Sequence, residues 1–419
     1  MFKKKNKTSK IMSAVEALKL IKSGDTVTTS GFHGSCVAED LIITLGKEYV
    51  KNQTPKNLTL VYCAGQGDFK TTGLSNLGHP GLVGKIIAGH FGGSPLLSRF
   101  VLDNKIQAYN FPQGVLSQMF RDIAAHKPRT ISAVGLGTFV DPRLQGGKVN
   151  SITTEDMIDL IEFDGKEYLS YRTFPIHIAI LRGTTADELG NISMEREALT
   201  LESQAQAMAV KNSGGKVIVQ VERIAKQGTL SPRDIEIPGI LVDAVVIGKP
   251  EHHWQTYAEP YNPAYSGETK APMAMVPALD LNIRKIIARR AAMELRPNAV
   301  INLGIGMADG IANVANEEGV LDEFTLTAEP GIIGGMPAAG PAFGACMNPH
   351  AIIAQPSQFD FYHGGGLDIA FLGLAQVDGQ GNSNVSKFGP KFSGTGGFID
   401  ISQNAKKVVF LGTFTATGL

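Results

Sequence analysis

The chain is poor in cysteine and carries no net charge. Its 419 residues include only three cysteines, Cys36, Cys63 and Cys346, and their wide separation fits no metal-binding spacing. This pattern argues against a secreted module held together by disulfides and favours a reduced, cytoplasmic protein. Lys+Arg and Asp+Glu both number 39. With no excess of either sign, the composition does not favour nucleic acid or an anionic membrane as a partner.

Long apolar runs are missing as well. The sequence has no stretch of about eighteen apolar residues, the length that a membrane-spanning helix requires. The N-terminal segment MFKKKNKTSK is polar and basic, and no apolar segment follows it. Because a secretory signal contains such a segment, we expect this end to be a flexible, solvated tail.

Glycine is the residue that the chain has in excess. There are 48 glycines, well above the usual share of about 7%. They gather after apolar runs rather than in a low-complexity tract. Because glycine lets the backbone approach a bound molecule closely, this distribution predicts ligand-binding loops.

The same order of motifs occurs twice along the chain. In each half a helical segment leads into a β-branched strand, a glycine loop and a second helix, and further strands and loops follow in matching order. Several matches in one order indicate an internal repeat more strongly than any one of them alone. The matching segments are 14–45 with 289–315, 58–67 with 324–335, 180–191 with 371–382, and 214–222 with 405–413.

This alternation of strands and helices predicts an α/β fold. We expect two related open α/β domains with mainly parallel sheets, whose functional loops lie at the carboxyl ends of the strands. The first half is longer between its first glycine loop and Asp187, so it holds an insertion. The aperiodic, polar and Pro-rich stretch HHWQTYAEPYNPAYSGETKAP is interpreted as a linker. We therefore predict an N-terminal domain at 1–250, a linker at 251–275 and a C-terminal domain at 276–419.

One carboxylate ends a short apolar strand, in the stretch LTAEPGIIGG. Glu329 is followed at once by Pro330, which biases Glu329 toward extended backbone geometry. Gly331, Gly334 and Gly335 are expected to clear space beside it, and its neighbours carry no positive charge. The ordinary alternative is a solvated or salt-bridged charge at the rim of the sheet. We favour a nucleophile, because a carboxylate in a narrow, weakly solvated place is more reactive.

Two glycine loops in the same half could assist such a nucleophile. Acyl transfer to Glu329 passes through a tetrahedral oxyanion, which backbone N–H groups stabilise. LGIGMADG follows an expected strand and opens a helix, so its amides and the helix dipole face an anion or oxyanion. SGTGGFID is a second loop of this kind. Either loop alone is weak evidence, but two beside one strand-end carboxylate predict an acyl-transfer site.

Taken together, these motifs resemble a family I coenzyme A transferase. The Gly-x-Gly loop, the AEPG turn, FYHGGGLDIAFLGLAQVDGQGNSNV and SGTGGFID are similar to the β half of that family. GFHGSCVAEDLI, KIIAGHFGGSP and YNFPQGVLSQMF are similar to its α half. Two halves in one chain resemble the branch that transfers CoA among short-chain acids such as propionate and acetate. The resemblance covers nearly the whole chain.

The resemblance implies a ping-pong reaction between a short-chain acyl-CoA and a free carboxylic acid. Glu329 would form a mixed anhydride and then a glutamyl-CoA thioester, without ATP, metal or bound cofactor, since coenzyme A is itself a substrate. Gln113, in NFPQG, matches a glutamine that holds the substrate carboxylate, although a turn-capping amide is the plainer alternative. A homo-oligomer is also implied. The positions that match the contacts to the thioester and its oxyanion are Gly304, Ile305, Gly306, Gly396 and Gly397.

Two departures from the family pattern stand out. Many members have Ser-Glu-Asn-Gly around the nucleophile, whereas this chain has Ala328-Glu329-Pro330-Gly331, which removes the side-chain hydrogen bond expected from the asparagine. Chains of this branch also continue beyond the segment that matches VVFLGTFTATGL. We therefore expect either a shortened product or further residues outside the 419 given.

Several polar residues near glycine loops have plainer explanations. The spacing of the four loop histidines fits no metal site, and CoA transfer requires no proton shuttle, so we expect them to serve as hydrogen-bonding loop residues. Asp187 and Asp378 occupy matching turns of the repeat and are expected to be structural. The four histidines are His33, His79, His90 and His363.

The sequence is compatible with two other functions. An acyl-CoA hydrolase on the same scaffold would use the same carboxylate and loops. A non-enzymatic module that senses a ligand or binds a sugar phosphate would explain glycine loops at helix starts. Such a module has no use for an activated carboxylate, and no output segment is visible in the sequence.

Overall fold

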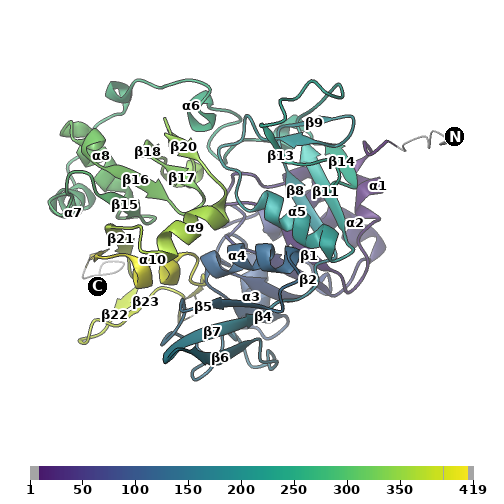
Figure 1. Ribbon diagram of the computed structural model, residues 1–419, viewed down its shortest axis with the longest axis horizontal. Helices are drawn as coiled ribbons and strands as arrows, with labels where there is room; N and C mark the ends of the chain where they lie inside the picture. The colour runs from purple at the N-terminus through teal and green to yellow at the C-terminus, as the bar shows by residue number, and fades with distance from the viewer. Residues whose placement is uncertain (1–8, 390, 414–419) are drawn as a thin grey trace.

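Two open sheets, one in each half of the chain, form the framework of the molecule (Figure 1). The computed structural model describes residues 9–389 and 391–413. Residues 1–8 of the predicted tail and the chain end at Leu419 lie outside the described residues. In the part of the chain that is described, no helix is both long and apolar enough to cross a bilayer.

The N-terminal half is built on a seven-stranded, fully parallel sheet. Its strands are rich in Val, Ile and Leu because helices cover both faces: α4 and α5 on one, α1, α2 and α3 on the other. In sheet order the strands are β14 (Ala244–Ile247), β11 (Lys216–Val221), β8 (Ile178–Arg182), β1 (Thr26–Thr29), β2 (Leu58–Tyr62), β3 (Val83–Ala88) and β4 (Gln107–Asn110). The helices are α1 (Ala14–Leu18), α2 (Glu39–Asn52), α3 (Pro95–Leu102), α4 (Gln113–Ala124) and α5 (Ser203–Asn212).

The C-terminal half has a six-stranded sheet with four parallel strands and two antiparallel strands at one edge. Helices α7 and α8 cover one face, and α9 and α10 cover the other. In sheet order the strands are β20 (Ala351–Ile352), β17 (Ile332–Ile333), β16 (Thr325–Ala328), β15 (Val300–Leu303), β21 (Ile369–Gly373) and β26 (Val408–Leu411). The helices are α7 (Ile283–Ala292), α8 (Asp309–Glu317), α9 (Gln355–His363) and α10 (Phe398–Asn404).

The two sheets repeat one another down to the pairing of residues. The order β2-β1-β8-β11 in the first sheet corresponds to β16-β15-β21-β26 in the second. Val27 pairs with Leu60 in the first sheet, and Ile301 pairs with Leu326 in the second. The predicted fold of two related α/β domains with mainly parallel sheets is therefore confirmed.

The added length of the first half widens its sheet and adds a small antiparallel one. Strands β3 and β4 extend the large sheet beyond β2, and β5 (Arg129–Ser132), β6 (Ile158–Phe163) and β7 (Lys166–Arg172) form a separate three-stranded sheet. The remaining short strands are β9 (Thr185–Asp187), β10 (Ile192–Ser193), β12 (Arg223–Ala225), β13 (Ile235–Ile237), β18 (Met336–Pro337), β19 (Cys346–Met347), β22 (Gln376–Val377), β23 (Ser383–Asn384), β24 (Lys387–Phe388) and β25 (Lys391–Phe392).

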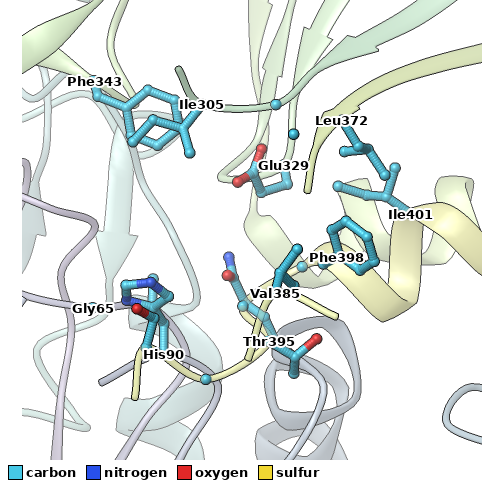
Figure 2. A pocket seen from close by; sticks show the side chains of 18 of the residues that line it. Gly65, His90, Ile305, Glu329, Phe343, Leu372, Val385, Thr395, Phe398 and Ile401 are labelled. Carbon is cyan, nitrogen blue, oxygen red and sulfur yellow. The ribbon is translucent and has the colours of Figure 1, made fainter. Parts of the chain in front are cut away.

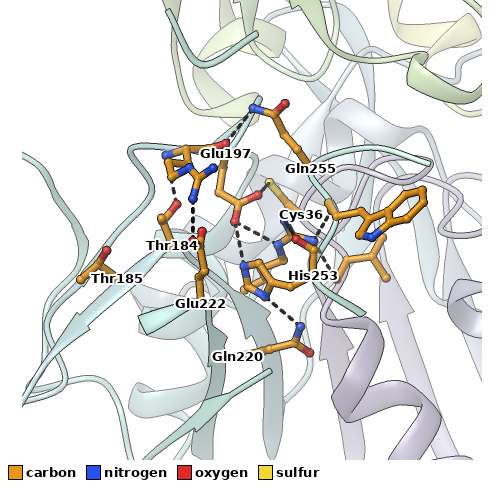
Figure 3. A network of polar contacts seen from close by, with 12 residues as sticks. Cys36, Thr184, Thr185, Glu197, Gln220, Glu222, His253 and Gln255 are labelled. Carbon is orange, nitrogen blue, oxygen red and sulfur yellow. Dashed lines mark hydrogen bonds and ion pairs between the residues drawn. The ribbon is translucent and has the colours of Figure 1, made fainter. Parts of the chain in front are cut away.

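The segment predicted as a linker packs against the N-terminal half. A buried ion pair joins Arg182 Nε to Glu197 Oε1 at 2.9 Å, and Arg182 Nη1 donates to the carbonyl of Trp254 at 2.7 Å (Figure 3). His253 Nε2 lies 3.6 Å from the same carboxylate oxygen of Glu197. Burial opposes ionisation of Glu197, but Arg182 and His253 lower its pKa to about 2. This part of the chain therefore completes a charged cluster, which its polar composition did not indicate. It also contains the short helix α6 (Pro263–Ser266).

The two halves meet through a loop that we call the second glycine loop, residues 393–397. The backbone N–H of Phe91 donates to the carbonyl of Ser393 at 2.7 Å, and that of Gly396 donates to the carbonyl of Gly89 at 2.8 Å. Helix α4 of the N-terminal half also packs against α9 and α10, which lie beside it at the junction in Figure 1. The loop thus belongs to one half but is held by the other.

Asn110, at the end of β4, stabilises the contact between the second glycine loop and the N-terminal half. Its side-chain Oδ1 accepts the backbone N–H of Thr395 at 3.0 Å, while Nδ2 donates to the carbonyls of Ala88 and Gly89 at 2.9 and 2.7 Å. The residue is completely buried. One amide side chain therefore satisfies three backbone groups that have no access to water.

We predict that Asn110→Ala lowers the free energy of unfolding by about 1–3 kcal/mol, because it leaves the buried N–H of Thr395 without a partner and removes two further hydrogen bonds to the carbonyls of Ala88 and Gly89. Chemical denaturation measures the change. The control is Asn52→Ala, which removes an exposed hydrogen bond to Glu48 and should change stability by less than about 0.5 kcal/mol. Equal effects of the two substitutions would contradict the role assigned to Asn110.

Candidate active site

Glu329 lies directly after β16, at the carboxyl end of a central strand of the C-terminal sheet. The preceding Leu326 and Thr327 are buried, and Thr327 pairs with Asn302 of β15. The backbone turns sharply after Pro330, where the N–H of Gly331 donates to the carbonyl of Ala328 at 3.1 Å. Glu329 is partly buried, and among the described residues no cation forms an ion pair with it.

The glycines that follow Glu329 allow neighbouring backbone to pack closely against them and do not create open space. A Cβ on Gly331 would lie 2.0 Å from the carbonyl oxygen of Ile353, and one on Gly335 would lie 2.3 Å from that of Met347. Gly331, Gly334 and Gly335 all have positive φ angles. None of the three lines the cavity beside Glu329. The expectation that they clear space there was therefore wrong: the returning chain fills that side.

A cavity of about 350 Å³ opens at the junction of the two halves and contains the Glu329 carboxylate (Figure 2). Both halves contribute to its wall, which is largely apolar and aromatic. Parallel strands place their following loops at one edge of a sheet, so the two facing sheets bring distant loops together. Its lining includes Phe32, His33, Gly65, Phe69, His90, Gln113, Asn302, Phe343, Leu372, Val385, Phe388, Thr395, Phe398 and Ile401.

The structure brings together nearly all the residues predicted for the site. Gly304, Ile305, Gly396, Gly397 and Gln113 line the same cavity as Glu329. Gly306 does not. It lines a neighbouring cavity of about 970 Å³, which shares His33, Phe69 and Ile305 with the first.

Most backbone N–H groups of the two glycine loops already have partners. Gly304 donates to the carbonyl of Phe371 at 2.8 Å, and Gly306 donates to a carboxylate oxygen of Asp309 at 3.1 Å. The N–H of Gly396 donates to the carbonyl of Gly89 in the N-terminal half. Within residues 304–306 and 393–397, all of them described, only the N–H groups of Ile305 and Gly397 are left without an acceptor.

Gly397 lies next to the side chain of Glu329. A Cβ built on Gly397 would be 3.6 Å from Cγ of Glu329. Gly397 also precedes the first residue of α10, so the positive end of that helix faces the cavity. Ile305 and Gly397, whose N–H groups are free, therefore line the same cavity as Glu329. Stabilising an oxyanion requires backbone donors of this kind.

The environment of Glu329 favours its protonated form more than water does. Burial raises the pKa of Glu329 to about 7, although the Asn302 amide opposes the shift, and the carboxyl groups of Asp309 and Asp400 add to it. Burial also raises the pKa of Asp309 to about 6. Because the charge on Glu329 is poorly solvated, the ionised carboxylate is a stronger nucleophile than one in water.

Gln113 is the first residue of α4 and is almost fully buried. Its Nε2 donates to Oε1 of Gln355 at 3.3 Å, and its backbone N–H donates to the carbonyl of Gly396 at 3.0 Å. Gln355 is itself completely buried, and its Nε2 has no partner in the described chain. The geometry thus orients the Gln113 amide beside the second glycine loop.

The first half has a different residue at the place that corresponds to Glu329. Cys63 follows β2 as Glu329 follows β16, and the strand pairings leading to both are equivalent. Cys63 is sealed beside Glu202, and burial raises the pKa of its thiol well above the ordinary value. The first half thus contributes the wall, the Asn110 contact and Gln113, while the second half supplies the carboxylate.

The loop histidines serve different local roles. His363 Nε2 lies 2.9 Å from Oδ1 of the buried Asp400, and His90 Nδ1 accepts the backbone N–H of Gly92 at 3.2 Å. The rings of His33 and His79 pack against aromatic side chains. In the described part of the chain, no three His, Cys, Asp or Glu side chains converge as a metal site would require.

The two turn aspartates behave as predicted. Asp187 and Asp378 each accept hydrogen bonds from the backbone N–H groups two and four residues further along, all at 2.9 Å. Their structural role is therefore confirmed.

The sequence did not single out three polar residues around Glu329. Asn302 lies in the neighbouring strand β15, Asp309 begins α8, and Asp400 lies in the first turn of α10. Asp400 stood in a motif already recognised, SGTGGFID, but nothing in that motif indicates that its side chain is buried beside another carboxyl group. The sequence feature that could have identified these three residues is a carboxyl or amide side chain within one helical turn of a glycine loop.

We predict that Glu329→Gln stabilises the protein above neutral pH. With a folded pKa of about 7 against an ordinary value of 4.5, wild-type stability falls as pH rises from about 4.5 through 7, because ionisation is harder in the folded state. The substitution should raise the free energy of unfolding by on the order of 1–2 kcal/mol at pH 8. Denaturation at pH 4 and pH 8 measures the difference, and a gain of the same size at pH 4 would contradict the assignment.

Comparison with known proteins places these features in a family. The family model described as coenzyme A transferase matches residues 11–248. The acetate CoA-transferase YdiF of Escherichia coli (strain K12) is 48% identical over 410 residues, covering 98% of this chain and 77% of that protein. The caffeate CoA-transferase of Acetobacterium woodii is 46% identical over 414 residues, covering 97% of this chain and 79% of that protein.

Solved structures agree with these sequence matches. The apoenzyme of the acyl-CoA transferase YdiF from Escherichia coli O157:H7 superposes with a TM-score of 0.93 at 46% identity and covers 100% of this chain and 79% of its own. A thioester complex of YdiF with CoA gives a TM-score of 0.92 at 46% identity, over 98% of this chain and 78% of its own. The chain therefore belongs to the coenzyme A transferase family and is a CoA-transferase.

Proposed function

We propose that this enzyme moves CoA between a short-chain acyl-CoA and a free carboxylic acid of the acetate or propionate type, through a glutamyl-CoA thioester on Glu329. The observation that carries the proposal is the position of that carboxylate: partly buried, without an ion pair, and in one cavity with two free backbone N–H groups. The name of the acetate CoA-transferase relative and the CoA thioester complex of YdiF support it.

The first step breaks the thioester bond of the donor. A carboxylate oxygen of Glu329 attacks the acyl carbon, and the resulting oxyanion accepts hydrogen bonds from the N–H groups of Ile305 and Gly397. The tetrahedral intermediate collapses by expelling the CoA thiolate. The product is a mixed anhydride between Glu329 and the acyl group.

The second step places CoA on the protein. The thiolate attacks the side-chain carbonyl carbon of Glu329, and the original acid leaves as a carboxylate. An acceptor carboxylate then attacks the glutamyl-CoA thioester and runs both steps in reverse. No net proton is transferred, and the free energy of the thioester bond is kept throughout, so the reaction requires neither ATP nor a resident cofactor.

Gln113 is proposed to hold the carboxylate of the free acid. Its amide lines the cavity and is oriented by Gln355. A neutral donor suits this task because a cation here would lower the pKa of Glu329 and weaken it as a nucleophile. The apolar wall around it limits access of water to the anhydride.

The proposal includes a cytoplasmic location and a homo-oligomeric state. All three cysteines are buried and unpaired, which supports a reducing compartment. Size measurement in solution tests the oligomeric state.

We predict that incubation with propionyl-CoA gives a CoA adduct on Glu329, seen as an increase in intact mass that borohydride removes. Glu329→Gln should form no adduct and should lose at least about 1,000-fold in transfer rate, because the nucleophile is gone. The control Glu318→Gln changes a surface carboxylate paired with Arg289 and should behave as wild type. Labelled acetate should enter acetyl-CoA. Release of free CoA without label transfer would identify a hydrolase instead, and an adduct in Glu329→Gln would exclude this nucleophile.

We also predict that formation of the adduct depends on pH with an apparent pKa near 7. Only the ionised carboxylate attacks the thioester, and burial raises the pKa of Glu329 to about 7. The single-turnover rate with propionyl-CoA should therefore rise about tenfold per pH unit below 7 and level off above it. A rate that is constant between pH 5 and pH 8 would contradict this.

A further inference from the structure

One hydrogen-bond donor in the cavity has no place in the mechanism above. His90 follows β3, in the segment GHFGG, and comes from the N-terminal half. Its ring borders the cavity across from the Glu329 carboxylate (Figure 2). Its position in the sequence indicated only the role of a loop residue.

The hydrogen bonding of the ring identifies its tautomer. Nδ1 accepts the backbone N–H of Gly92 at 3.2 Å, so in a neutral ring the proton must be on Nε2. Burial, with a smaller contribution from His33, lowers the pKa of His90 to about 4, so the ring is neutral at physiological pH. Nε2–H has no acceptor in the described chain, although the ring is not sealed from the cavity.

The surrounding backbone holds the ring in this orientation. A Cβ on Gly65 would lie 2.5 Å from Nδ1 of His90, and one on Gly92 would lie 2.8 Å from its Cε1. On the other side, a Cβ on Gly396 would lie 3.7 Å from its Cδ2. Backbone without side chains therefore surrounds the imidazole closely, and the second glycine loop that borders it also carries the free N–H of Gly397.

We propose that His90 Nε2–H donates a hydrogen bond to an oxygen of the acyl substrate: the carbonyl oxygen of the bound thioester and, in the return half-reaction, a carboxylate oxygen of the free acid. This inference rests on the proposed function. His90 acts as a fixed neutral donor, since the transfer moves no proton. It makes the N-terminal half part of acyl recognition, together with Gln113.

The test uses two substitutions that separate the nitrogens of the ring. His90→Gln places an amide nitrogen near the position of Nε2, so this variant keeps a donor toward the cavity. His90→Asn keeps only a group near the position of Nδ1. We expect His90→Asn to lower kcat/KM for acetate about 10- to 100-fold and His90→Gln to stay within about threefold of wild type. Wild-type behaviour of His90→Asn, or equal losses in both variants, overturns the proposal.

A spectroscopic measurement gives a readout besides rate. In protein labelled with ¹⁵N-histidine, the Nε2 signal of His90 is identified as the one that disappears in His90→Gln. Between pH 6 and pH 8 its chemical shift should be that of a protonated nitrogen. The signal should move when acetate is added at a concentration that saturates transfer. An unprotonated Nε2, or no shift, also overturns the proposal.

The two proposals fail in different ways. If the wild-type chain transfers no label from acyl-CoA to acetate, the proposed function is wrong. If the wild-type chain transfers label and the two His90 variants do not differ, only the role of His90 is wrong.

Discussion

The active site depends on a set of hydrogen bonds that cross between the two halves of the chain. Glu329 belongs to the C-terminal half, but the loop that places Gly397 beside it is held by the backbone of Gly89 and Phe91 and by the side chain of Asn110. All of these groups are shielded from water, so each bond is costly to lose. The free N–H of Gly397 is therefore kept in place by residues far earlier in the sequence.

The same contact determines the electrostatics of the site. Closing the junction removes water from Glu329, and the nearby Asp309 and Asp400 disfavour a further negative charge. The Asn302 amide partly offsets this effect without adding a full positive charge. A carboxylate in such surroundings is ionised near neutral pH but remains poorly stabilised, and formation of an acyl bond relieves that cost.

The fold class, the repeat and the site loops could be predicted from the order of residues, because each depends on local pattern. Alternating strands and helices, glycines after apolar runs and a carboxylate at a strand end are all visible without coordinates. Gln113 and the two glycine loops could be matched to Glu329 through their resemblance to a family. The turns at Asp187 and Asp378 were equally clear, since a turn aspartate bonds only its own neighbours.

Which backbone groups remain free, and which charges meet, became clear only from the folded chain. Gly304 and Gly396 looked like donors in the sequence, but their N–H groups are used by the sheet and by the other half. Gly331 was expected to leave open space beside Glu329, but the backbone of Ile353 occupies that space. The polar stretch around His253 has no periodic pattern in the sequence, yet it packs on a buried ion pair. In each case the deciding partner is far away in sequence, and a local pattern contains no information about such a partner.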